Sequence, residues 1–158
     1  MDDQSATAPA RRLQPIPRSL PAILMRAREA VMTRVRPVLR AYDVTEPQWR
    51  VLRTLASIEE VEVTQLADLV FLLPSSLSRI LKDLTERGLI QRRSAASDLR
   101  KGLVSISDKG MALIEAATPE AVKVTTEIER LFGSDRLGRL IGLLEELEAA
   151  VGPGRPAD

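Results

Sequence analysis

The chain has 158 residues, of which 44% are hydrophobic and 3% aromatic, and this composition favours one domain with an aliphatic, mostly helical core. It contains no cysteine and no histidine, which excludes disulfide bonds, thiolate chemistry, Ser-His catalysis and histidine-bearing metal sites. We therefore expect no enzyme, no metal site and no cofactor.

Positive and negative side chains are unevenly spread, although the net charge is only +1. Basic residues outnumber acidic ones 10 to 3 from Arg11 to Arg53 and 7 to 3 from Arg79 to Lys101, whereas acidic residues lead 10 to 6 from Gly102 onward. This asymmetry favours a surface that faces a polyanion, although solvated helix faces also produce charge runs. No run approaches the roughly 18 apolar residues of a membrane span, so we expect a cytoplasmic protein.

The first half of the chain predicts a flexible arm over residues 1–18 and then two helices. Ser19 as N-cap, with proline two residues later, begins an amphipathic helix that should run to about Ala41. Pro37 inside this helix predicts a kink near residue 33. Thr45 caps a second helix, whose apolar stripe includes Trp49.

The second half predicts short elements followed by long helices. "VEV" at 61–63 is a possible strand, Thr64 caps a short helix, and another helix begins at Pro74 or Ser75 and ends before Gly88. "LIQRR" and "GLVSI" flank a polar, basic loop and predict a hairpin. Ser107 caps a long helix with a kink or break at Thr118-Pro119, and a last helix from about Ser134 precedes a flexible tail over 153–158.

Two short helices joined by a tight connection and followed by a basic hairpin predict a winged helix-turn-helix. In the second helix the apolar positions face the core, which leaves a polar face near its N-terminus, where helices favour phosphate. Arg79 could reach a guanine, while the serines could bond bases or phosphates. The predicted DNA contacts on this helix are Ser75, Ser76, Ser78, Arg79 and Lys82. A helix cap for Ser75 and a solvated face for the two cations are the alternatives.

The loop of the hairpin adds a second set of candidates. Arg100 could probe a minor groove, Asp98 could hold the loop by pairing with an arginine, and Lys101 is ambiguous. Thr64 and Gln65 begin the preceding helix and could bond phosphate, although capping alone would account for the threonine.

Residues 63–110, "VTQLADLVFLLPSSLSRILKDLTERGLIQRRSAASDLRKGLVSISDKG", closely resemble the DNA-binding core of the MarR family of winged-helix regulators. The Asp-x-Arg of the family's wing falls on Asp98 and Arg100, and its Leu-Thr-x-x-Gly stands here as Ile-Ser-Asp-Lys-Gly at 106–110. Residues 19–55 look like the branch that represses aromatic-acid degradation operons, the homoprotocatechuate branch.

The resemblance implies a mainly α fold with a small β-hairpin wing, in which a helical dimerisation region carries a winged helix-turn-helix domain. The dimerisation region would comprise residues 19–44 and 108–152, and the DNA-binding domain residues 45–107. The apolar stripe from Leu137 to Val151 supports a homodimer, because it needs a partner. Packing of this stripe on the long helix of its own chain is the alternative.

Regulators of this family usually bind an effector between the dimerisation helices and the winged helix. A small aromatic carboxylate or phenolic effector, or its thioester, needs a cation for its acid group and flat apolar walls. The candidates are Arg26, Arg28 and Trp49. Solvated or intersubunit salt-bridge roles for the arginines and core packing for the tryptophan remain open.

We therefore expect a dimeric transcriptional regulator, a repressor released by an aromatic acid, that binds double-stranded DNA at a pseudo-palindromic site. A winged-helix module that binds another protein, without ligand response, is the alternative. Salt-dependent binding to duplex DNA would separate the two.

Overall fold

The computed structural model describes residues 19–94 and 102–152 of the chain. Within them lie six helices and three strands. In chain order these are α1 (Leu20–Ala41), α2 (Glu46–Leu55), β1 (Val61–Glu62), α3 (Val63–Leu69), α4 (Pro74–Glu86), β2 (Ile90–Ser94), β3 (Gly102–Ile106), α5 (Asp108–Phe132) and α6 (Ser134–Val151). The predicted mainly α fold with a small β wing is confirmed.

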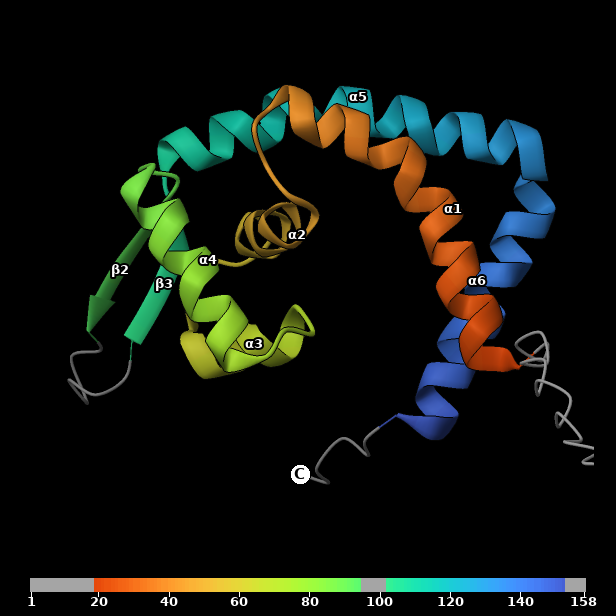
Figure 1. Ribbon diagram of the computed structural model, residues 1–158, viewed down its shortest axis with the longest axis horizontal. Helices are drawn as coiled ribbons and strands as arrows, with labels where there is room; N and C mark the ends of the chain where they lie inside the picture. The colour runs from red at the N-terminus through yellow and green to blue at the C-terminus, as the bar shows by residue number, and fades with distance from the viewer. Residues whose placement is uncertain (1–18, 95–101, 153–158) are drawn as a thin grey trace, which may run out of the picture.

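The elements form two parts joined by one long helix. Helices α2, α3 and α4 and the sheet make a winged-helix lobe, while α6 and the N-terminal part of α1 make a helical arm (Figure 1). Helix α5 spans from one part to the other and runs beside the C-terminal part of α1 (Figure 1). The Tyr42 hydroxyl donates to the Ala116 carbonyl at 2.8 Å and ties the end of α1 to α5.

The core of the lobe is aliphatic and closed. Leu77, Leu81 and Leu84 of α4 are 0% exposed, as are Leu52 and Leu55 of α2. The three leucines of α4 recur at the spacing that keeps one face of a helix inward. Burial of this stripe fixes which side of α4 remains outside.

Three strands form one antiparallel sheet in the order β1-β3-β2. The predicted hairpin pairs Ile90 with Ile106, and the predicted strand at residue 61 pairs Val61 with Val104. Val104 lies in the central strand and is 0% exposed, whereas β2 is exposed after its first residue. The sheet therefore covers the core with one end and extends its hairpin beyond it.

Several helix ends follow the predicted signals. Thr45 and Gln48 form a capping box, in which the Thr45 amide donates to Gln48 Oε1 at 2.7 Å. The Ser107 hydroxyl accepts from the Gly110 amide at 3.0 Å and so caps α5. Gly88 follows α4 with φ +68°, a left-handed conformation that glycine adopts without a steric penalty.

One predicted helix start is wrong, and one of the two alternatives for another is confirmed. Helix α3 begins at Val63, and its N-cap is Glu62, two residues ahead of the predicted cap Thr64. Helix α4 begins at Pro74 with Leu73 as its N-cap, so Ser75 lies inside the first turn. Proline at the first helical position needs no amide partner, and the helix can therefore start there without a side-chain cap.

Each of the two long helices α1 and α5 contains a proline and continues through it. Helix α5 runs without interruption through Pro119, so the predicted break is wrong. The Thr118 hydroxyl donates to the Ile114 carbonyl at 2.6 Å beside the missing amide. Helix α1 contains Pro37, and its ribbon bends between its two ends (Figure 1).

Candidate functional site

The exposed face of α4 carries the side chains that the sequence predicted for DNA. All five lie outside the core, on the side opposite the buried leucines: Ser75, Ser76, Ser78, Arg79 and Lys82. The Ser78 hydroxyl donates to the Pro74 carbonyl at 2.9 Å, which leaves its oxygen free to accept. Lys82 lies 3.9 Å from Glu86 in an exposed ion pair, which contributes little to stability.

The other DNA candidates are placed less completely. Thr64 and Gln65 are exposed in the first turn of α3. Asp98, Arg100 and Lys101 lie outside the described residues. On the neighbouring strand β2, Arg92 and Arg93 are exposed, and Arg93 makes two contacts to Glu60, at 2.7 and 2.5 Å. The sequence had placed these two arginines in a strand without assigning them a role.

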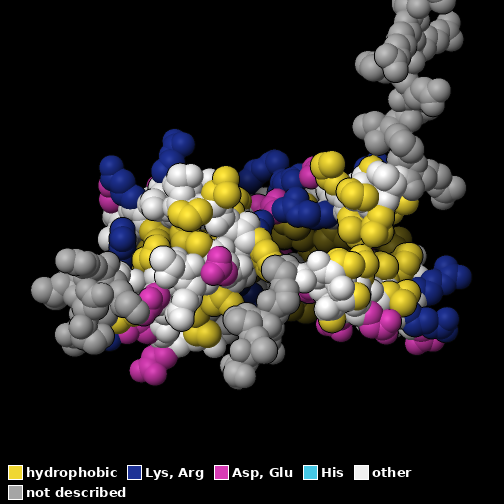
Figure 2. Space-filling view, turned by 90° about the horizontal axis from the view of Figure 1, so that it is seen from below, with side chains coloured by type: hydrophobic (Ala, Val, Ile, Leu, Met, Phe, Trp, Pro, Cys, Tyr) yellow, Lys and Arg dark blue, Asp and Glu magenta, His cyan; other side chains and the backbone are white. Residues whose placement is uncertain are grey.

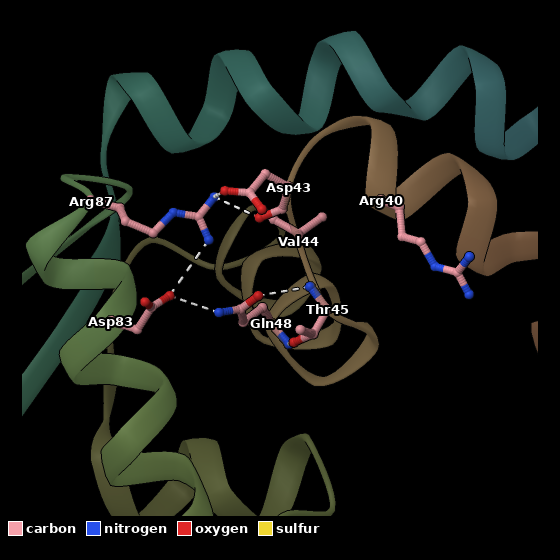
Figure 3. A pocket seen from close by; sticks show the side chains of 7 residues that line it. All are labelled: Arg40, Asp43, Val44, Thr45, Gln48, Asp83 and Arg87. Carbon is pink, nitrogen blue, oxygen red and sulfur yellow. Dashed lines mark hydrogen bonds and ion pairs between the residues drawn. The ribbon is translucent and has the colours of Figure 1, made fainter.

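The C-terminal end of α4 is held by a polar cluster from α2 and from the turn after α1. The Gln48 amide group donates to Asp83 Oδ2 at 2.7 Å, and Arg87 lies 3.5 Å from the same oxygen. Arg87 also donates to the Asp43 carbonyl at 2.7 Å. Figure 3 shows Gln48, Asp83 and Arg87 pointing toward one another. The orientation of the exposed face of α4 is therefore linked to the junction between α1 and α2.

The N-terminal end of α4 is held from α2 as well. Arg50 donates from Nη1 to the carbonyl oxygen of Val70 at 2.8 Å, just before the turn that leads into α4. Its Nη2 lies 3.5 Å from Glu46 Oε1. Neither this cluster nor the one at the other end was predicted, because each joins residues at least 20 positions apart.

Arginines from α1 converge on the same Glu46. Arg28 forms an ion pair with Oε1, and Arg36 lies 3.5 Å from Oε2. Together with Arg50, three guanidinium groups therefore surround one carboxylate, and the Glu46 side chain is only 16% exposed. Arg36 also donates to Glu29 at 2.5 and 2.7 Å. These two hydrogen bonds lower the pKa of Glu29 and raise the pKa of Arg36.

A cavity of about 360 Å³ opens beside this cluster. Apolar walls from Leu39, Val44 and Pro47 meet charged groups from Arg36, Arg40 and Glu46, with Thr45 between them. A second cavity of about 330 Å³ shares Arg40, Val44 and Thr45 with the first and is also lined by Gln48, Asp83 and Arg87 (Figure 3). The first cavity has the size and the mixed lining of a small-molecule site.

The three predicted effector residues lie in different surroundings. Both arginines are exposed, but Arg28 also forms an ion pair with Glu46 of α2, which lines the cavity. Trp49 packs partly against the core, with the Arg53 guanidinium 6.0 Å from its ring centroid. Trp49 does not line the 360 Å³ cavity. Arg36, which the sequence did not single out, does.

The helical arm exposes a large apolar surface. No residue of α6 is buried, and Leu140, Ile141, Leu143 and Leu144 are between 38% and 62% exposed. On the arm, α1 adds further exposed apolar side chains, and Figure 2 shows hydrophobic side chains gathered on this part of the molecule. Over residues 19–94 and 102–152, no helix combines the length and apolar character that crossing a bilayer requires.

The model of the MarR family matches residues 44–101. The homoprotocatechuate degradative operon repressor of Escherichia coli is 34% identical over 140 residues, which cover 89% of this chain and 94% of that protein. The crystal structure of transcriptional regulator PA4135 is 35% identical, with a TM-score of 0.81 over 85% of this chain and 98% of that one. NadR in complex with 4-hydroxyphenylacetate is 32% identical, with a TM-score of 0.72 over 93% and 97% of the two chains. The chain belongs to the MarR family of winged-helix transcriptional regulators.

Proposed function

We propose that this regulator is a repressor that binds a pseudo-palindromic operator as a homodimer and is released by a small aromatic acid or its thioester. The observation that carries DNA binding is the orientation of α4. Its leucines are fully buried, so its serines, Arg79 and Lys82 face outward, with the serines in the first turns of the helix. This is the arrangement with which a recognition helix enters a major groove. The role requires no catalysis, and a repressor acts in the cytoplasm, where bacterial DNA lies.

The exposed apolar surface of the helical arm supports the homodimer. Isolated monomers rarely expose so many large apolar side chains together, and a two-fold contact buries the same surface of both copies. Two winged-helix lobes held in this way would meet half-sites about one helical turn apart, roughly 10 base pairs. We expect a dimer at micromolar concentration in analytical ultracentrifugation.

The effector site that we propose is the 360 Å³ cavity between α1 and α2. Leu39, Val44 and Pro47 supply apolar walls for a ring, while Arg36 and Arg40 supply cations for a carboxylate. Arg28 does not line the cavity but forms an ion pair with Glu46, which does. The relatives support the class of ligand, since one represses an aromatic degradative operon and another is bound to 4-hydroxyphenylacetate.

The test of the proposed function is binding to the DNA upstream of the chain's own gene, followed by fluorescence polarisation across a salt series. We expect affinity to fall steeply with salt, because phosphate contacts release counterions. A panel of aromatic acids and their thioesters is then added at fixed salt, and one of them should weaken binding. Absence of binding at low salt would instead favour a module that docks on another protein.

The proposed DNA contacts are tested by two substitutions. Arg79→Ala should reduce discrimination between operator and random DNA by about 1–3 kcal/mol, whereas Arg100→Ala should weaken binding to all sequences more evenly. Lys123→Ala is a matched control, because Lys123 pairs with Glu120 on α5, away from α4. Equal losses on specific and random DNA for both arginines would contradict the division between base and backbone contacts.

A further inference from the structure

We propose that Arg50 is a positioning residue that couples the arginine cluster on Glu46 to the recognition helix. Its guanidinium group bonds the Val70 carbonyl, just before the turn into α4, and lies 3.5 Å from the Glu46 carboxylate. The proposal deepens the proposed function, on which its role in effector response rests. It assigns to a named hydrogen bond the step between effector binding and release of DNA.

The turn between α3 and α4 depends on few contacts. Phe71 has φ +50°, an unfavourable conformation for a residue with a side chain, and its amide donates to the Asp68 carbonyl at 3.2 Å. The Leu72 amide donates to the Ala67 carbonyl at 3.1 Å. Val70 is 0% exposed, so its carbonyl needs a protein donor, and Arg50 supplies one at 2.8 Å. Loss of that donor would leave a buried acceptor unpaired beside a strained turn.

The guanidinium group of Arg50 interacts with two partners, the Val70 carbonyl and the Glu46 carboxylate. One nitrogen donates to Val70 at 2.8 Å, and the other lies 3.5 Å from Glu46, a longer contact than a good charge-assisted hydrogen bond. Glu46 shares its charge with Arg28 and Arg36, which weakens its hold on Arg50. A carboxylate ligand in the cavity that takes Arg36 would remove one competing cation from Glu46. Glu46 would then draw Arg50 away from Val70 and loosen the turn that positions the N-terminus of α4.

Substitutions of Arg28 and of Glu46 should have opposite effects on the turn before α4. Arg28→Gln removes a competitor from Glu46 and should therefore act like the ligand, although Arg28 has no contact with the turn among its described interactions. Glu46→Gln removes the pull on Arg50, so it should keep the turn closed and abolish the response. Arg50→Lys retains a charge but lacks the planar guanidinium group that bonds both Val70 and Glu46. It should therefore show little coupling between the two.

The experiment needs no ligand in its first part. Amide hydrogen exchange is measured at Phe71 and Leu72 in the full-length protein, together with affinity for the operator. We expect Arg28→Gln to speed exchange at the turn and weaken DNA binding several-fold, and the double variant with Glu46→Gln to return both to the wild-type values. Lys123→Gln, which breaks an ion pair on α5, should change neither. Unchanged exchange at the turn in Arg28→Gln would overturn the proposal.

The second part uses 4-hydroxyphenylacetate as the probe and measures its binding by calorimetry without DNA. In the wild type this acid should reduce operator affinity by about tenfold, a typical size for coupling between two sites. Arg50→Gln should still bind the acid with little change but should lose most of that reduction. Retention of the full reduction in Arg50→Gln would overturn the proposal. If the acid does not bind the wild type, 4-hydroxyphenylacetate is not the effector, and the first part still decides the role of Arg50.

Discussion

The winged-helix lobe and the helical arm are both built from amphipathic helices, but they bury their apolar faces differently. The leucine stripe of α4 is 0% exposed within one chain, whereas no residue of α6 is buried. The stripe of α4 meets α2, α3 and the sheet, whereas α6 contacts mainly the end of α5. A similar sequence pattern therefore indicates a completed core in one region and an incomplete one in the other.

The largest effect should follow from a cavity in the lobe. Leu81→Ala removes a fully buried side chain of α4 and should lower the free energy of unfolding by about 2–5 kcal/mol. Urea denaturation at a fixed protein concentration measures this loss. The matched change Leu144→Ala, at a residue 38% exposed in one chain, should cost a monomer much less. Equal losses in monomeric protein would remove the contrast between the two regions.

A charge on the arm should act on assembly. Ile141→Asp places a carboxylate on the exposed stripe of α6, where a partner would have to desolvate it. We expect dimer dissociation to increase by a hundredfold or more, equivalent to about 3 kcal/mol, with little change in helix content. Analytical ultracentrifugation and circular dichroism measure the two quantities. An unaltered dimer would mean that another surface holds the two copies together.

The turn before α4 should tolerate a change that most lobe positions would not. Phe71 is 77% exposed and has φ +50°, so Phe71→Gly relieves backbone strain and removes little buried surface. We expect the protein to become more stable by about 1 kcal/mol, or less if the flexible glycine also favours the unfolded chain. Thermal unfolding measures the sign. A loss of stability would show that the exposed ring makes contacts that offset the strain.

The smallest effect concerns pH and the ion pair between Glu29 and Arg36 of α1. The hydrogen bonds from Arg36 lower the pKa of Glu29 in the folded protein. Its contribution to stability is therefore present above the unfolded pKa near 4.5 and is lost as pH falls through the lower, folded value. The stability difference between wild type and Glu29→Gln should be small near neutral pH, because the pair is exposed. It should vanish in acid, because Glu29 is then protonated. Urea midpoints of both proteins at several pH values measure it.

The sequence was sufficient for the outline of the lobe and for the family. Thr45, Gly88 and Ser107 act through neighbouring residues only, so their roles at helix ends could be predicted locally. The effect of Pro119 could not be predicted locally. Packing against neighbouring helices can keep a helix continuous through a proline, and α5 is packed along α1. The roles of Asp98, Arg100 and Lys101 in DNA binding stay predictions.

The apolar spacing of α4 by itself determined which side chains face outward, because a helix of 3.6 residues per turn leaves only one face for its leucines. Only the tertiary structure decided how that face is held. Gln48, Arg50 and Glu46 lie within two turns of α2, but their partners come from α1, from the end of α3 and from α4. Contacts between segments so distant in the chain depend on how the helices pack, and that packing is set by the whole core.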